Sequence, residues 1–321
     1  ILQLLHQKPS HIVMPAIHLK REEVGRMFEE KGISKEIGNY DPTYLTRCAR
    51  QHLRNQFMEA GAGMTGCNFG VAKTGDVVVC TNEGNADMST SMPKLHLVAM
   101  GIEKIVPDYR SLAVFQRLLC RSATGQPTTA YTSHFRQARP GGEMHVILVD
   151  NGRSDIIADE DHWETLKCIR CGSCMNTCPV YRRSGGYSYT YFIPGPIGIN
   201  LGMLRNPQRY SDNVSACTLC LSCDNVCPSK VNPGSQVYLW RQKLDSLHRA
   251  NRIKKLMSEG MEVLFDHPAL YASTLRLAPL ANLIPDSLTH IRAVNPWGVG
   301  HTKPEFAKES FQTLWKKGKV K

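Results

Sequence analysis

The stretch Cys168-Ile-Arg-Cys171-Gly-Ser-Cys174-Met-Asn-Thr-Cys178-Pro179 recurs further along the chain as Cys217-Thr-Leu-Cys220-Leu-Ser-Cys223-Asp-Asn-Val-Cys227-Pro228. Both copies have the spacing C-x2-C-x2-C-x3-C-P, in which a short loop directs three thiolates at one cube of iron and sulfide. A single C-x2-C pair would also fit zinc, but two matching runs that each end in proline disfavour zinc ribbons and disulfides. The repeat therefore predicts two [4Fe-4S] clusters.

The fourth cysteine of each run has a separate role. In two-cluster ferredoxins of the bacterial type, it ligates the cluster of the other run. We therefore predict one ligand set of Cys168, Cys171, Cys174 and Cys227, and a second set of Cys217, Cys220, Cys223 and Cys178. This exchange would tie the two runs together.

Length and charge limit the other possibilities. The chain has 321 residues, enough for two domains, and a formal net charge of +11. Each cluster with four thiolates carries about −2, so two clusters would bring the net charge to about +7. The remaining charge fits a solvated basic surface or an acidic partner protein, and no recognition module indicates nucleic acid.

Compartment and membrane contact follow from composition. Cluster assembly needs reduced thiols, which predicts a cytoplasmic protein. The chain begins at Ile1 without the features of a signal peptide, so we expect a mature or truncated amino end. The most apolar stretch, 268–288, is interrupted by Arg276, Pro279 and Asp286, which leaves at most peripheral membrane contact.

Strand and helix patterns alternate before the cysteine runs. Strands are predicted at 77–80, 95–100 and 145–149, a short β-like run at 11–19, and helices at 21–31, 43–60 and 108–120. Residues 121–142 are predicted to form a long loop. Together these patterns predict an α/β domain over residues 1–155.

A polar loop follows the predicted strand at 77–80. It contains Glu83 and Asn85, and ligands gather at the carboxyl ends of strands in open α/β sheets. Glu83 and Asn85 are therefore candidates for binding a small acid or handling its proton. The alternative is an ordinary turn in which Gly84 and Asn85 supply the backbone conformation.

Two further regions complete the predicted organisation. Residues 156–240 are predicted to form the two-cluster ferredoxin-type domain, with a helix at 236–257, and residues 241–321 a helical and Pro-rich carboxyl-terminal arm. Aromatic side chains between the runs are expected to shield cluster sulfur from water. They are Tyr181, Tyr187, Tyr189, Tyr191 and Phe192.

Several separate stretches jointly resemble the lactate utilization protein B (LutB/LldF) iron–sulfur family. They are His11-Ile-Val-Met-Pro-Ala-Ile-His18, Thr65-Gly66-Cys-Asn-Phe, Thr81-Asn-Glu-Gly-Asn85, Gly101-Ile-Glu-Lys-Ile-Val-Pro107, Asp150-Asn-Gly-Arg-Ser154, Pro194-Gly-Pro-Ile-Gly198 and both cysteine runs. The resemblance covers nearly the whole chain. Family proteins are longer at the amino end, so the first part of their LUD domain is expected to be missing here.

The resemblance implies both a fold and a function. The fold is a Rossmann-like (LUD, NagB/RpiA-like) domain followed by the ferredoxin domain. The function is electron transfer within an NAD-independent complex that oxidises L-lactate to pyruvate, with the chain not catalytic alone. The implied partners are a cysteine-rich subunit of the LutA/LldE type and a small LUD subunit of the LutC/LldG type. No flavin or dinucleotide fingerprint is visible in the sequence.

Two alternatives stay open. The chain could be the iron–sulfur subunit of another 2-hydroxy-acid oxidase, such as glycolate oxidase, although no cysteine-rich repeat of the kind typical of such subunits follows Cys227. It could also be a scaffold whose α/β domain binds a metabolite and whose clusters are structural.

Overall fold

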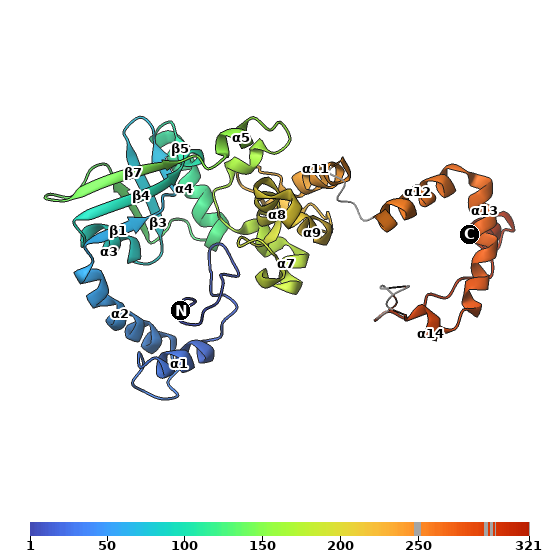
Figure 1. Ribbon diagram of the computed structural model, residues 1–321, viewed down its shortest axis with the longest axis horizontal. Helices are drawn as coiled ribbons and strands as arrows, with labels where there is room; N and C mark the ends of the chain where they lie inside the picture. Colours follow the sequence, from blue (N-terminus) through green and yellow to red (C-terminus); the bar gives the residue numbers. More distant parts are fainter. Residues whose placement is uncertain (247–251, 292–294, 296–297, 299, 321) are drawn as a thin grey trace. The chain divides into compact units, whose positions relative to one another are not determined.

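The computed structural model describes residues 1–246, 252–291, 295, 298 and 300–320 (Figure 1). The chain divides into two compact units, Ile1–Arg249 and Ala250–Lys321. The first unit contains a mixed α/β region and a helical region that carries the cysteine runs. The predicted domain boundaries after 155 and 240 stay predictions, and the second of them falls inside helix α11, Pro233–Ser246.

The α/β region alternates helices and strands as the sequence predicts. Its helices are α1 (Arg21–Glu30), α2 (Pro42–Glu59), α3 (Asn85–Ser91), α4 (Tyr109–Thr124) and α5 (Arg153–Ile157). Its strands are β1 (Ala62–Thr65), β2 (Phe69–Val71), β3 (Asp76–Thr81), β4 (Leu95–Gly101), β5 (Ile105–Val106), β6 (Tyr131–Phe135) and β7 (Glu143–Val149), and the 3-10 helix η1 spans Ile102–Lys104. Helix α4 starts where its sequence signal places it, because the Asp108 side chain accepts from the Ser111 backbone N–H.

The strands form two sheets. A parallel sheet has the order β1-β4-β7, and a mixed sheet has the order β5-β2-β3-β6 (Figure 1). Helix α3 packs on β1, and the contact requires glycine at position 63, since a Cβ there would lie 1.7 Å from the Ser89 carbonyl oxygen. The crossover from β3 through α3 to β4 therefore joins the mixed sheet to the parallel one.

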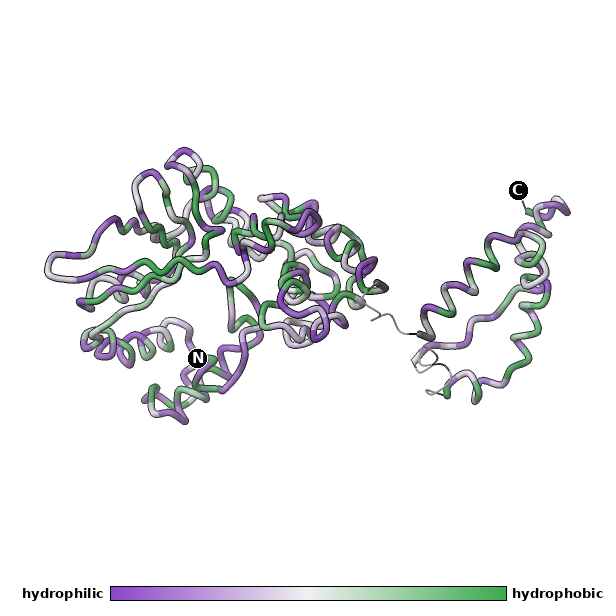
Figure 2. The backbone as a smooth tube through the Cα atoms, turned by 45° about the horizontal axis from the view of Figure 1, so that its top comes forward, coloured by the Kyte–Doolittle hydropathy of each residue, from purple (hydrophilic) through white to green (hydrophobic). Residues whose placement is uncertain are grey.

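The core of the α/β region lies between the mixed sheet and α4. Phe69, Val71 and Val78 from the strands pack with Leu112 and Leu119 of α4. Figure 2 shows the hydrophobic residues concentrated along the strands. Ile169 and Cys171, from the first cysteine run, belong to the same buried cluster. The first run is therefore built into the core of the α/β region.

Two predictions about this region are wrong. The segment 121–142 contains strand β6, which pairs antiparallel with β3, so it is not a continuous loop. The segment 11–19 forms turns and no strand. The reason lies in the buried His11 ring, whose Nδ1 accepts from the backbone N–H groups of Val13 and Met14 at 3.0 and 3.1 Å and holds the chain in a tight turn.

The turns at 10–18 pack against the cysteine-bearing region. His11 Nε2 lies 3.2 Å from Asn176 Oδ1, and the Tyr181 hydroxyl donates to the Ser10 carbonyl oxygen at 2.6 Å. Gly172, at a φ of 80°, faces the same turn, and a Cβ there would lie 3.0 Å from the His11 ring. The amino-terminal segment thus covers the first run.

Short helices make up the rest of the first unit. They are α6 (Ser173–Thr177), α7 (Pro179–Ser184), α8 (Gly195–Arg205), α9 (Pro207–Ala216), α10 (Ser222–Val226) and α11, with 3-10 helices η2 (Trp163–Lys167) and η3 (Gly186–Ser188). The predicted helix at 236–257 is divided between α11 and α12 (Arg252–Asp266), and residues 247–251 lie outside the described residues.

The second unit is helical in its described part. It contains α12, α13 (Pro268–Leu277), η4 (Ala278–Leu283), α14 (Asp286–Thr289) and α15 (Phe311–Lys316). Across the portions of the chain that the structure describes, none of the helices combines the length and apolar character needed to cross a bilayer.

Candidate metal centre

Both cysteine runs follow the same backbone path. The third and fifth positions have positive φ in each run, 65° and 80° at Arg170 and Gly172, and 53° and 57° at Leu219 and Leu221. A five-residue helix follows in each case, α6 or α10, after which the fourth cysteine is extended. Leucine at positive φ is strained, so the surrounding structure must hold the loop in this form. The sequence repeat is therefore a structural repeat.

The first predicted ligand set lies around one small cavity. Its lining includes Cys168, Cys171 and Cys174 from the first run and Cys227 from the second. Met175, Ile197 and Val231 are buried beside these cysteines, and Ile12 packs against them from the amino-terminal segment. The structure therefore brings the fourth cysteine of the second run to the three leading cysteines of the first.

The second predicted set is also brought together. Burial raises the pKa of the Cys223 thiol, Asp224 adds to this, and Cys217 and Cys178 raise it further. The pKa of Cys217 is likewise raised by burial, and Cys178 and Cys220 act on it in the same direction. These effects link Cys217 to Cys178, Cys220 and Cys223 of the second predicted set. The ligand assignment itself stays a prediction.

The donor set fits iron–sulfur clusters. Burial raises the pKa values of Cys168 and Cys174, so these thiols are neutral unless a positive centre stabilises their thiolates. Backbone N–H groups also point at sulfur: those of Tyr181, Leu219 and Val231 lie 3.5, 3.4 and 3.3 Å from Cys178, Cys217 and Cys227. Such donors stabilise a metal-bound thiolate more than a thiol.

The two sets differ in their surroundings. Cys171 is buried against the α/β core, whereas Cys220 is exposed. The first set also has buried positive charge nearby, since Lys104 Nζ lies 3.4 Å from the Cys168 carbonyl oxygen. The first set is therefore enclosed, and the second reaches the surface.

The expected aromatic shield is only partly present. Tyr189 is buried, and its pKa is raised first by this burial and then by the neighbouring Cys178. Tyr181 packs against the same hydrophobic cluster. Tyr187 and Phe192 are 53% and 64% exposed, so the prediction that they shield cluster sulfur is wrong. Tyr187 instead bonds to the amino-terminal segment, with its hydroxyl 2.8 Å from His18 Nε2.

Glu83 and Asn85 lie away from the cysteines in sequence and are both exposed, in the loop after β3 and at the start of α3. Strand β3, which precedes them as predicted, pairs antiparallel with both β2 and β6. Their role in handling a small acid stays a prediction.

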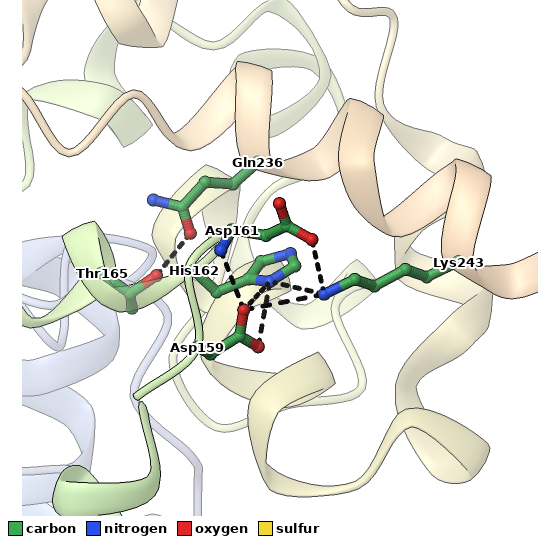
Figure 3. Close-up of polar contacts among 6 residues, drawn as sticks. All are labelled: Asp159, Asp161, His162, Thr165, Gln236 and Lys243. Carbon is green, nitrogen blue, oxygen red and sulfur yellow. Dashed lines mark hydrogen bonds and ion pairs between the residues drawn. The ribbon is translucent and has the colours of Figure 1, made fainter. Parts of the chain in front are cut away.

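A cluster of charged side chains connects residues 159–162, which precede the first cysteine run, to helix α11. Asp159, Asp161 and His162 present ligand atoms within 4.8 Å of one another, the only such group of three His, Cys, Asp or Glu side chains among the described residues. Figure 3 shows Lys243 directed at them, with its Nζ 2.9 Å from Asp161 and 3.6 Å from Asp159. The ammonium group supplies the positive charge, so this is an ion-pair network.

Two family models match consecutive parts of the chain. The family model for the LUD domain matches residues 7–156, and that for the 4Fe-4S dicluster domain matches residues 164–231. The uncharacterized electron transport protein YkgF of Escherichia coli (strain K12) is 37% identical over 99% of this chain and 68% of its own length.

Other relatives carry the name lactate utilization protein B. The protein from Bacillus pumilus (strain SAFR-032) is 37% identical over 97% of this chain and 68% of its own length, and that from Shouchella clausii (strain KSM-K16) is 39% identical over 85% and 58%. The chain thus spans about three fifths to two thirds of the curated relatives it matches. No solved structure matches it significantly.

Ligand exchange predicts which cysteine variants behave alike. Cys178→Ser should leave the same reduced EPR spectrum as Cys220→Ser, and Cys227→Ser the same spectrum as Cys171→Ser, because each pair removes a ligand from one set. Each variant should lose about half of its iron. Cys48→Ser, which alters a buried thiol of α2, is the control and should keep both signals. If Cys178→Ser instead matched Cys171→Ser, the exchange would be refuted.

Proposed function

The chain belongs to the lactate utilization protein B family, and on that premise we propose that it is the iron–sulfur electron-transfer subunit of an NAD-independent complex that oxidises L-lactate to pyruvate. One observation supports the proposal: Cys168, Cys171 and Cys174 of the first run line one cavity together with Cys227 of the second. Clusters bound there, two in number on this proposal, would accept and pass on single electrons.

The two predicted ligand sets differ in burial, and this difference suggests which of them exchanges electrons with a partner. The enclosed first set lies against the α/β region, and the second reaches the surface at the exposed Cys220. Leu221 and Val226, 43% and 40% exposed, flank this surface with apolar side chains. The chain therefore offers the second set, through Cys220, for contact with a redox partner.

The partners that the family implies are part of the proposal. They are a cysteine-rich LutA/LldE-type subunit and a small LutC/LldG-type LUD subunit, in the cytoplasm. We also infer a Rossmann-like, NagB/RpiA-like arrangement for the α/β region. The parallel order β1-β4-β7 supports this inference. The reaction needs an acceptor for the two electrons and the hydrogen of lactate, so the chain alone would not catalyse it.

The electron-transfer role predicts a dependence on partner subunits. Anaerobically reconstituted chain should show no L-lactate turnover with an artificial acceptor, whereas adding both partners should let L-lactate reduce its clusters, measured by visible absorbance and EPR. Glycolate in place of L-lactate is the control for substrate class. Turnover by the chain alone, or clusters that stay oxidised in the complete complex, would contradict the proposal.

Glu83 and Asn85 remain candidates for substrate handling. If Glu83 takes the substrate proton, Glu83→Gln should reduce turnover of the reconstituted complex by about 100-fold or more while iron content and Tm stay unchanged. Glu59→Gln, an exposed carboxylate at the end of α2, is the matched control. Turnover of Glu83→Gln within about threefold of the unmodified complex would remove Glu83 from the site.

A further inference from the structure

A large cavity in the first unit adjoins the first predicted ligand set. It has a volume of about 600 Å³ and is lined by residues from the linker, the first cysteine run and α8. Cys168, a predicted ligand of the first cluster, forms part of its wall. Cavities of about 300–1,000 Å³ hold cofactor-sized ligands. The cavity is therefore large enough for a cofactor-sized ligand.

Three arginines from different elements line this cavity. Arg153 begins α5, Arg170 lies between Cys168 and Cys171, and Arg205 ends α8. Tyr191 lines the cavity with them. Burial raises the pKa of its hydroxyl, and all three guanidinium groups oppose that rise. The three positive charges are therefore gathered around one side chain.

Among the residues that the structure describes, only one of these arginines has a carboxylate partner. Arg153 pairs with Glu103 through its Nε. Arg205 Nη1 donates to Asn151 Oδ1 at 3.3 Å, a neutral acceptor, and the buried Nη1 of Arg170 has no hydrogen-bond partner among the described residues. Gathered cations and a buried unpaired donor are unfavourable unless an anion balances them.

The acidic side chains of the lining do not supply this balance. Glu103 is engaged by Arg153, and Asp159 faces Lys243 and His162. Asp155 is exposed on α5. Within the described chain, neither Arg170 nor Arg205 forms an ion pair with any of the three.

A second buried donor lines the same cavity. The indole Nε1 of Trp240 is buried and has no hydrogen-bond partner in the described parts of the chain. Phe192, which is exposed, adds an aromatic surface to the lining. The cavity thus offers cationic and neutral donors together with aromatic walls.

We propose that this cavity binds a phosphate-bearing organic molecule with an aromatic ring, of the nucleotide class, with its phosphate held by Arg170 and Arg205. The guanidinium group of arginine binds phosphate through two parallel hydrogen bonds, and aromatic side chains stack on a planar ring. The site uses arginines where dinucleotide-binding folds use a Gly-rich turn, so the usual sequence fingerprint is absent. Binding does not depend on the proposed lactate oxidation. Only a redox role for a ligand beside Cys168 would rest on that proposed function.

Calorimetry on the anaerobic, cluster-loaded protein tests the proposal with flavin mononucleotide as the probe. Riboflavin is the matched control, since it has the same ring without the phosphate. We expect flavin mononucleotide to bind at least about tenfold more tightly than riboflavin, and also more tightly than inorganic phosphate. Equal binding of riboflavin, equal binding of inorganic phosphate, or no binding of flavin mononucleotide would overturn the assignment.

Two variants locate the site. Arg205→Gln should weaken flavin mononucleotide binding at least about tenfold with iron content unchanged, because Arg205 lies outside the cysteine loops. Arg54→Gln, an exposed arginine of α2, should leave binding unchanged. If Arg205→Gln bound the probe as well as the unmodified protein, the arginines would serve only as counter-charge to the cluster and the site would be rejected. Because the measurement is binding, its failure would leave the electron-transfer proposal to its own test.

Discussion

The gathering of the eight cysteines of the two runs, all of them buried or half-buried except Cys220, is the constraint on which the helical region depends. Burial alone raises the pKa values of thiols such as Cys174 and Cys223 and favours their neutral form. Bound iron–sulfur cores would offset the free-energy cost of holding buried thiolates, because metal ligation stabilises the fold that presents them. The two runs also touch directly, with Thr177 of α6 hydrogen-bonded to Ser222 of α10. On the predicted ligand assignment, neither set is complete without the other run.

The same constraint ties the α/β region to the cysteines. Ile169 and Cys171 share a core with α4, and the Ser173 hydroxyl donates to the Ser122 carbonyl oxygen at 2.5 Å. On the other side, His11 holds a turn against Asn176. A ligand in the adjoining cavity would therefore lie beside Cys168, next to the core that the first run shares with the α/β region.

Sequence reasoning reached the parts whose signals are local. The cysteine spacing, the strand at Val77 and the helix over 108–120 were predictable because each depends on neighbouring residues. It missed the turn at His11, because that turn depends on the ring of one histidine and a contact with Asn176, 165 residues away in sequence. It also missed the arginine cavity. Arg153, Arg170 and Arg205 are ordinary surface residues by pattern, and only the fold brings them together. The antiparallel setting of β3 was equally invisible, since strand pairing is non-local.

The number of clusters is the central claim, and iron and sulfide analysis of the anaerobically reconstituted protein measures it most directly. The predicted result is about eight irons and eight sulfides per chain, with the absorption and EPR spectra of [4Fe-4S] cubes. Four irons per chain, or zinc at comparable occupancy, would contradict the account.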